Sequence, residues 1–160
     1  MDDATVRPLY IFDLDGTLAS CQHRVRFLEE KHNPNRWREF YAACDWDPPI
    51  KTTITVMNAL RLVGDVLIWT GRSDEVREKT VAWLANHTSF LTHELEVVLT
   101  MRQAGDHRTD DVLKGEWLAG LNPDQRRQLW AGAVFEDRDR MVALYRDAGF
   151  TCYQVAPGGF

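Results

Sequence analysis

The sequence has few cysteines, no long apolar run and no excess of positive charge, and each shortage excludes a class of protein. Its three cysteines, Cys21, Cys44 and Cys152, form no CxxC pair, which argues against a disulfide framework or a zinc site and favours free thiols in a reducing cytoplasm. Apolar runs such as Val66–Trp69 are far too short to cross a bilayer, and the acidic start of the chain lacks the apolar region of a signal peptide. We therefore expect a cytoplasmic protein with no membrane partner.

The formal net charge of -5 opposes extended binding to duplex nucleic acid, which depends on counterion release by many lysines and arginines. A short contact with a nucleic-acid end, or with a nucleotide, remains open. The 160 residues, of which 44% are hydrophobic and 27% charged, suit one soluble domain with a substantial core. These features make no prediction of the oligomeric state.

Short apolar runs alternate with helical patterns, which predicts βα units around a mostly parallel sheet. The expected strands are residues 9–12, 66–69, 97–99, 133–135 and 152–155. Ser73, Thr109 and Asn122 are expected to cap three of the helices, and the last helix should stop at Gly149. We predict one α/β domain that covers residues 1–160.

A pair of acids follows directly after the first expected strand. Asp13 and Asp15 flank Leu14, and Gly16 with Thr17 completes the motif Asp-Leu-Asp-Gly-Thr. Ligands bind beyond the carboxyl ends of strands in open α/β sheets, and residues two apart in an extended chain point the same way, so the two carboxylates should meet at one sheet edge. Such carboxylates repel unless a cation or a shared proton relieves them. The spacing favours a divalent metal or an acid/base pair, although a bare Asp-Gly is more often a simple turn.

Three further polar motifs lie at the ends or on the surface of predicted elements. They are Thr70-Gly71-Arg72 after the second strand, Lys114 on a helix, and Glu136-Asp137 after the fourth strand. Each motif alone is typical of a turn or a solvated surface. In this order, and together with the first acid pair, they resemble the haloacid dehalogenase superfamily of phosphotransferases. The resemblance implies a Rossmann-like core, with a mostly parallel sheet flanked by helices and a small cap insertion after the first strand.

The resemblance implies a catalytic role for four residues. Asp13 would be the nucleophile that accepts the phosphoryl group, and Asp15 would act as general acid and then as general base. Thr70 and Lys114 would bind the phosphoryl oxygens, where negative charge builds in a loose transition state.

The resemblance also implies a metal site. Anionic phosphate beside several carboxylates calls for a hard cation such as Mg²⁺. Its ligands would be the carboxylates of Asp13 and Asp137 and the backbone carbonyl of Asp15, with Glu136 behind them in a second layer.

A closer resemblance covers nearly the whole chain. Met101–Gln103, Arg108–Val112 and Glu136–Arg138 are similar to segments in the phosphatase domains of the T-even phage polynucleotide kinase/phosphatase family. Those domains remove 3'-phosphates from nucleic-acid ends and from nucleoside 3'-phosphates, with Mg²⁺ and an aspartyl-phosphate intermediate. One departure is Glu136, where that family has Asp. The chain contains no GxxxxGK[ST] loop, so a kinase half is not expected.

By position, this closer resemblance implies a set of substrate-binding residues. They are Thr17, Arg24, Gly71, Arg72 and Asp110. Arg24 and Arg72 would touch the phosphate, Arg24 from a more exposed entrance, and Asp110 would pair with Lys114 and orient it.

Residues 21–49 form an expected cap insertion after the first strand. The segment combines arginines with Trp37, Phe40 and Tyr41, and it ends at the breaker Asp47-Pro48-Pro49. The aromatic side chains can stack on the bases of a single-stranded end. Their spacing of three and four can equally bury one face of a helix against the core. The sequence leaves both interpretations open.

The predicted function is a Mg²⁺-dependent phosphatase that acts on 3'-phosphates of nucleic-acid ends or on nucleoside 3'-phosphates. A nucleotidase for free 5'-mononucleotides is the alternative, because the core chemistry is shared and the insertion selects the leaving group. The compact insertion and the acidic charge support this alternative. A non-catalytic module that binds phosphorylated ends is a third hypothesis, which the full set of catalytic residue types opposes.

Overall fold

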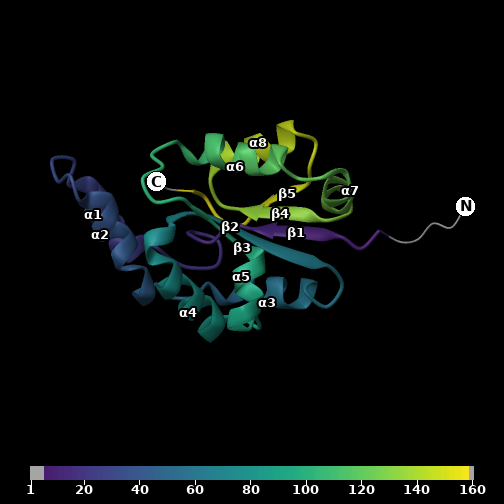
Figure 1. Cartoon of the computed structure of the whole chain (residues 1–160), viewed down its shortest axis with the longest axis horizontal. Helices are drawn as coiled ribbons and strands as arrows, with labels where there is room; N and C mark the ends of the chain where they lie inside the picture. The colour runs from purple at the N-terminus through teal and green to yellow at the C-terminus, as the bar shows by residue number, and fades with distance from the viewer. Residues whose placement is uncertain (1–5, 159–160) are drawn as a thin grey trace, which may run out of the picture.

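In the computed structural model, which describes residues 6–158, a parallel sheet runs through the molecule with helices on both faces (Figure 1). Its strands are β1 (Leu9–Phe12), β2 (Asp65–Ser73), β3 (Leu99–Arg102), β4 (Ala133–Glu136) and β5 (Cys152–Gln154). The strand order is β3-β2-β1-β4-β5, and each neighbouring pair is parallel. This confirms the predicted fold class; residues 1–5 and 159–160 of the predicted domain lie outside the described part.

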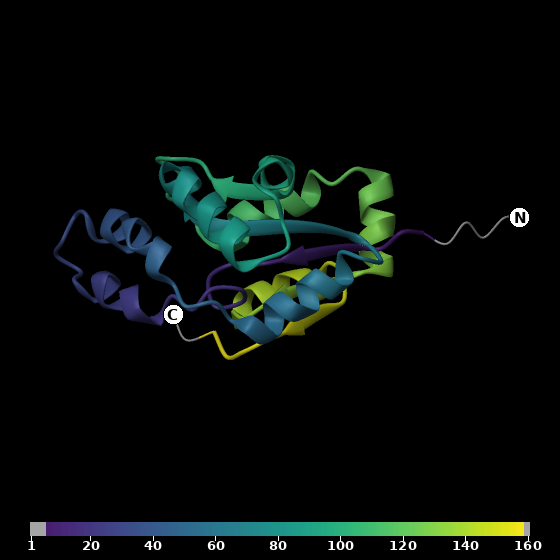
Figure 2. The same cartoon turned by 90° about the horizontal axis from the view of Figure 1, so that it is seen from below.

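Helices cover both faces of the sheet, one layer on either side of the strands (Figures 1 and 2). One face carries α3 (Lys51–Leu60), α4 (Arg77–His87) and α5 (Thr92–Val98), and the other α6 (Asp110–Ala119), α7 (Pro123–Ala131) and α8 (Asp139–Asp147). Successive strand residues point to opposite faces, so Phe12 and Ile68 pack in the first layer while Ile11 and Trp69 pack in the second. Both faces of β1 are therefore buried, as its apolar sequence predicts.

The expected strand at residues 97–99 is wrong in its first two positions. Val97 and Val98 end the helix α5, and the strand begins only at Leu99. Leu95 buries that helix against the core, and Glu94 accepts a hydrogen bond from the amide of Leu91 at 2.7 Å, which secures the first turn. Tertiary packing thus overrides the β-propensity of the two valines.

The strand β2 is longer than predicted. It continues through Thr70, Gly71 and Arg72 to Ser73, so these residues belong to the strand instead of following it. The pairing with β3 shifts register between Thr70 and Ser73. This irregularity lies at the sheet edge where ligands bind in open α/β folds.

The predicted helix ends are partly correct. Asn122 accepts a hydrogen bond from the amide of Gln125 at 2.8 Å and begins α7, and Gly149, with a φ of 87°, follows α8. Ser73 accepts from the amide of Glu75, but it begins a short 3-10 helix, Asp74–Val76, that precedes α4. Thr109 stands at the start of α6 without a capping bond from its side chain.

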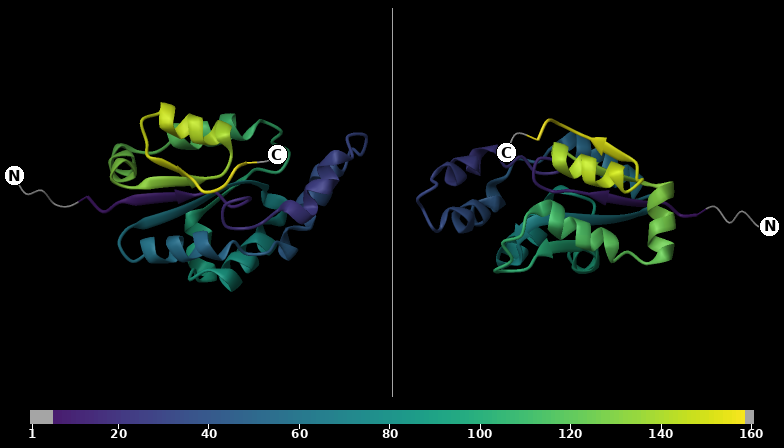
Figure 3. Two further views of the ribbon diagram at one scale, coloured as in Figure 1. Left: turned by 180° about the vertical axis from the view of Figure 1, so that it is seen from behind. Right: turned by 90° about the horizontal axis from the view of Figure 1, so that it is seen from above.

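The insertion after β1 projects from the carboxyl ends of the strands (Figures 1 and 3). It contains α1 (Gln22–Glu29), α2 (Arg36–Ala42) and a 3-10 turn, Cys44–Trp46. Two backbone hydrogen bonds close its base, from the amide of Ser20 to Pro48 and from the amide of Ile50 to Leu18, both at 2.8 Å. The insertion is therefore tied to the core at both of its ends.

Two expectations from composition bear on the described residues. All three cysteines are free, as predicted, and the structure shows that all three are also buried. No helix within residues 6–158 is long and apolar enough to span a bilayer.

Candidate active site

The carboxyl ends of two neighbouring strands, β1 and β4, bring the predicted acids together. Asp13 follows β1, and its amide donates to the carbonyl of Phe135 in β4 at 3.0 Å, so the strand path continues past Phe12. The chain then turns tightly at Gly16, which has a φ of 90°. A Cβ on Gly16 would overlap the carboxylate of Asp137, so only glycine fits both the backbone conformation and the close approach.

Lys114 lies between two buried carboxylates. Its Nζ donates to Asp13 at 2.5 Å and to Glu136 at 3.0 Å, although the residues are 101 and 22 positions apart. Only 2% of Lys114 is exposed. Burial by itself would lower the pKa of Lys114, but the charges of Asp13 and Glu136 outweigh burial and raise this pKa well above its usual value. Lys114 is therefore a fixed positive charge at the end of β1.

The acids around Lys114 outnumber it. Burial, followed by repulsion from Glu136, raises the pKa of Asp13 to about 7, and burial with repulsion from Asp13 raises the pKa of Asp137 to about 8. Glu136 accepts from the amides of Asp137 and Arg138 at 3.0 and 3.3 Å through its second oxygen. This group carries more negative than positive charge, which disfavours the ionised forms of Asp13 and Asp137 and raises their pKa values.

The same acids fit a hard cation. Asp13, Glu136 and Asp137 each offer a carboxylate oxygen, and these oxygens lie within 4.8 Å of one another. The Oδ1 atom of Asp137 and the hydroxyl of Thr17 are buried without a hydrogen-bond partner within the described residues, which is costly unless another partner satisfies them. Carboxylate oxygens are the ligands that Mg²⁺ prefers.

Asp15 belongs to a separate, closed ring of buried charges. Arg24 Nη2 lies 2.5 Å from Asp15 and 2.7 Å from Asp47, and Arg72 Nη2 lies 2.6 Å from each of the same acids. Burial alone would raise the pKa of Asp15, but Arg72 and Arg24 outweigh burial and lower it. We call Asp15, Arg24, Asp47 and Arg72 the charge ring.

A pocket of about 540 Å³ opens between the insertion and the loop that follows β3. From the core it is lined by Asp13, Asp15, Gly71, Ser73, Lys114 and Glu136; from α2 by Trp37, Arg38, Phe40 and Tyr41; and from the loop by Gln103, Gly105, His107, Arg108 and Thr109, among others. This volume is typical of a site for one small ligand. The carboxylates of Asp13 and Asp15 both face it.

The aromatic residues of α2 divide between the two interpretations left open by the sequence. Phe40 is 2% exposed and packs beneath Arg24, whose guanidinium carbon lies 4.1 Å from the ring centre. Trp37 is 48% exposed at the pocket. Tyr41 donates from its hydroxyl to the carbonyl of Gly71 at 3.3 Å across the pocket. Phe40 therefore holds the insertion together, while Trp37 is accessible to a ligand.

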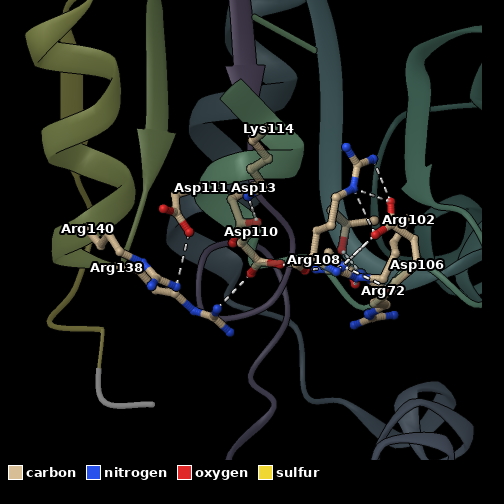
Figure 4. Close-up of polar contacts among 12 residues, drawn as sticks. Asp13, Arg72, Arg102, Asp106, Arg108, Asp110, Asp111, Lys114, Arg138 and Arg140 are labelled. Atoms are coloured by element: carbon tan, nitrogen blue, oxygen red, sulfur yellow. Dashed lines mark hydrogen bonds and ion pairs between the residues drawn. The ribbon is translucent and has the colours of Figure 1, made fainter. Parts of the chain in front are cut away.

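Asp110 does not pair with Lys114, contrary to the expectation from the resemblance. It binds two arginines instead, as Figure 4 shows: Arg102, which donates to one carboxylate oxygen, and Arg138, which donates to the other at 2.7 Å. Arg102 also donates to the carbonyls of Gly71 at 2.8 Å and of Arg108 at 2.6 Å. Asp110 and Arg102 thus hold the loop 103–109 in place as one wall of the pocket.

Arg24 does not lie at an exposed entrance, so that expectation is wrong. Its side chain and that of Arg72 are fully buried in the charge ring, and neither lines the pocket. Thr70 is also fully buried, and its hydroxyl accepts from the amide of Arg72 at 3.2 Å. The structure therefore places Asp13, Asp15, Gly71 and Lys114 at the pocket and the two arginines behind it.

Residues 7–160 match the family model described as the polynucleotide kinase PNKP phosphatase domain. The chain belongs to this family. It is therefore a phosphoric monoester hydrolase with a haloacid dehalogenase core, which agrees with the sheet order and with the insertion after β1.

Solved structures similar to this PNKP phosphatase domain include two chains from a Pnkp1/Rnl/Hen1 assembly. The structure of the Pnkp1/Rnl/Hen1 RNA repair complex has a chain that is 25% identical, with a TM-score of 0.71 over 100% of this chain and 46% of that one. A second structure of the Pnkp1/Rnl/Hen1 complex shares the fold, with 24% identity and a TM-score of 0.68 over 99% and 49% of the two chains. This chain spans about half the length of the chains it matches.

Sequence reasoning missed two residues of this PNKP phosphatase domain. The sequence pattern places Asp47 only in a breaker before two prolines, and Arg102 only in the segment Met101–Gln103 that resembles the phage phosphatase domains. The need for Asp47 arises because Arg24 and Arg72 are buried and carry more positive charge than Asp15 alone offsets, and that burial is visible only in the structure. The resemblance of the segment Met101–Gln103 likewise gives no partner for Arg102.

The charge balance at Lys114 predicts a large effect on stability. Lys114→Met keeps an unbranched side chain but leaves Asp13 and Glu136 buried without their cation, so it should lower the free energy of unfolding by about 3 kcal/mol or more. Urea unfolding at neutral pH measures this change. Lys51→Met, at an exposed lysine on α3, is the matched control and should shift the midpoint little; equal midpoints for both variants would contradict the assignment.

Proposed function

We propose that this chain hydrolyses 3'-phosphates at nucleic-acid ends, or in nucleoside 3'-phosphates, through an aspartyl-phosphate on Asp13. The observation that carries the proposal is the position of Asp13, which faces the pocket from the end of β1 with Lys114 at 2.5 Å. Membership of the PNKP phosphatase family supports a polynucleotide substrate, as does the likeness to a chain from an RNA repair complex.

In the first step, a carboxylate oxygen of Asp13 attacks phosphorus, and the bond between phosphorus and the 3'-oxygen breaks. Lys114 neutralises charge on the transferring phosphoryl group, and its fixed position means that little reorganisation is needed during the reaction. Asp15, which also faces the pocket, gives its proton to the leaving 3'-oxygen. The products of this step are a 3'-hydroxyl end and the phosphorylated Asp13.

In the second step, water attacks the phosphorus of the acyl phosphate and releases inorganic phosphate. Asp15 now takes the proton from the attacking water, which restores the state in which the cycle began.

The site would hold Mg²⁺ through the carboxylates of Asp13 and Asp137 and the backbone carbonyl of Asp15. When bound, the cation neutralises charge on the phosphate and on the surrounding carboxylates. Glu136 would stay behind these ligands, since one of its oxygens binds Lys114 and the other binds backbone amides.

We also propose that residues 21–49 act as a cap that selects nucleic-acid ends. Helix α2 presents Trp37 and Arg38 to the pocket, and both are exposed. An aromatic face suits a terminal base, and a guanidinium suits a neighbouring phosphate in the strand. Arg36, two residues earlier on the same helix, instead donates to the carbonyl of Lys31.

Asp13→Asn should abolish turnover and leave the fold intact, because the amide has the same shape but cannot act as an anionic nucleophile. Release of inorganic phosphate with Mg²⁺ measures turnover, and circular dichroism checks the fold. Activity above about one-tenth of the parent, which corresponds to a barrier change of roughly 1.4 kcal/mol, would remove Asp13 from the role of nucleophile. The complete absence of activity in the parent would instead favour a module that only binds phosphorylated ends.

Chelation of divalent cations should abolish phosphate release, and Asp137→Asn should reproduce this loss because it removes a charged metal ligand. Asp139→Asn is the matched control, since Asp139 lies two residues away and binds Gln154 at 2.6 Å. Titration with Mg²⁺ measures the concentration that restores half of the activity. Full activity of the parent in metal-free buffer would refute the metal site.

Substrate preference tests the proposed cap directly. A 3'-phosphorylated single strand should release phosphate at least about tenfold faster than its 5'-phosphorylated twin or a 5'-mononucleotide, by kcat/KM. Arg38→Gln should lower kcat/KM more for the oligonucleotide than for a nucleoside 3'-phosphate, whereas Arg36→Gln should change neither. Equal or faster hydrolysis of 5'-mononucleotides would favour the nucleotidase.

A further inference from the structure

Asp47 joins the insertion to the catalytic core through the charge ring. Asp47 and Arg24 come from the insertion, while Asp15 and Arg72 come from the core. Each arginine contacts one acid from the insertion and one from the core, so positive and negative groups alternate around the ring. The contacts Arg24–Asp15 and Arg72–Asp47 join the insertion to the core. The position of the insertion and the position of Asp15 are therefore set by the same group of atoms.

The side chain of Asp47 is completely buried and uses both of its oxygens. Oδ1 accepts from Arg24 Nε and lies near His23 Nε2, both at 2.8 Å, and Oδ2 accepts from Arg24 at 2.7 Å and Arg72 at 2.6 Å. Its backbone carbonyl accepts from the indole of Trp83 at 2.8 Å. The two bonds from Arg24 fix the plane of its guanidinium, because bidentate hydrogen bonds specify orientation as well as distance. Arg72 is held by a single bond from Nη2, which fixes the position of that end of its guanidinium.

Both arginines contact the carboxylate of Asp15, and neither lines the pocket. Arg72 Nε donates to both oxygens of Asp15, at 3.0 and 3.1 Å, and Arg24 reaches the same carboxylate. Asp15 lines the pocket, whereas the arginines do not. A phosphate in the pocket would meet the Asp15 carboxylate before it could meet either guanidinium.

We propose that Asp47 is a positioning residue for phosphoryl transfer, which fixes Arg24 and Arg72 so that they orient Asp15 instead of binding the substrate phosphate. This inference rests on the proposed function, in which Asp15 protonates the leaving 3'-oxygen. Proton transfer requires the donor to lie within hydrogen-bond reach of that oxygen. Loss of Asp47 therefore acts on the reaction through the placement of Asp15.

The leaving group provides the test, because p-nitrophenolate departs without a proton whereas a ribose oxygen needs one. Single-turnover rates are measured for Asp47→Asn with p-nitrophenyl phosphate and with a nucleoside 3'-phosphate. The asparagine keeps the shape of the side chain and the backbone contact with Trp83. We expect the rate for the nucleoside 3'-phosphate to fall at least about thirtyfold, and the burst of p-nitrophenolate to stay within about threefold of the parent.

Thermal unfolding of each variant shows whether it is folded under the assay conditions. If Asp47→Asn does not fold, Arg72→Lys takes its place, because lysine keeps the charge but cannot make the bidentate contact with Asp15. It should produce the same dependence on the leaving group. A merely structural role would lower both rates equally, and an arginine that binds phosphate would raise KM for both substrates when it is replaced.

Either of those two results overturns the inference. A parent enzyme that releases phosphate from neither substrate overturns the proposed function itself. A parent that is active on both, with an Asp47→Asn variant equally impaired on both, overturns only the positioning role. The two failures are therefore distinguishable in one set of measurements.

Discussion

Compensation of buried charge at the carboxyl ends of the strands is the constraint on which this structure depends. The charge ring buries two guanidinium groups and the Asp47 carboxylate completely, and it leaves the Asp15 carboxylate exposed only at the pocket, at a considerable cost in desolvation. The alternation of Asp15, Arg24, Asp47 and Arg72 offsets that cost, because every charged group faces two groups of opposite sign. Removal of one member leaves each of its neighbours with one partner of opposite sign instead of two, so the four residues stabilise one another and hold the insertion against the core.

The acids next to the charge ring carry more negative charge than the neighbouring lysine neutralises. Lys114 pairs with Asp13 and Glu136, Asp137 lies beside them, and the pKa values of Asp13 and Asp137 are raised to about 7 and about 8. The neutral charge ring and the acid-rich group of Asp13, Glu136 and Asp137 therefore differ in their need for a ligand. The ring is complete without a ligand and can set geometry, while the acid-rich group is completed by what binds there, which in the proposed function is a hard cation together with phosphate.

The pocket is shaped by elements that the ring and Asp110 hold in place. Helix α2 forms one wall because the ring secures the insertion, and the loop 103–109 forms another because Arg102 and Asp110 hold its backbone. Both walls contribute residues that the catalytic core does not need, such as Trp37 and Arg108. This arrangement agrees with a shared phosphatase core in which the surrounding segments select the substrate.

Local patterns in the sequence were enough to predict much of this protein. The apolar run before Asp13, the cap at Asn122 and the stop at Gly149 depend on neighbouring residues, so the α/β class and these element ends could be inferred. Motif order likewise indicated which residues would be chemically important, because the strands of an open parallel sheet end at one edge. The structure does place Asp13, Lys114 and the acids after β4 together there.

Only the tertiary structure decided which charges pair. Asp15 and Arg72 are 57 positions apart, and Arg24 and Asp47 are 23 apart, so no local pattern could show that Arg24 is buried or that Asp47 is more than a breaker before two prolines. Packing of α5 against the core likewise places Val97 in the last turn of a helix with its side chain exposed, although valine favours strands. The sequence by itself determined which chemical groups reach this edge of the sheet, because each group follows its own strand at a fixed, local spacing along the chain. The residues with which these groups pair depend on long-range contacts that exist only in the folded chain.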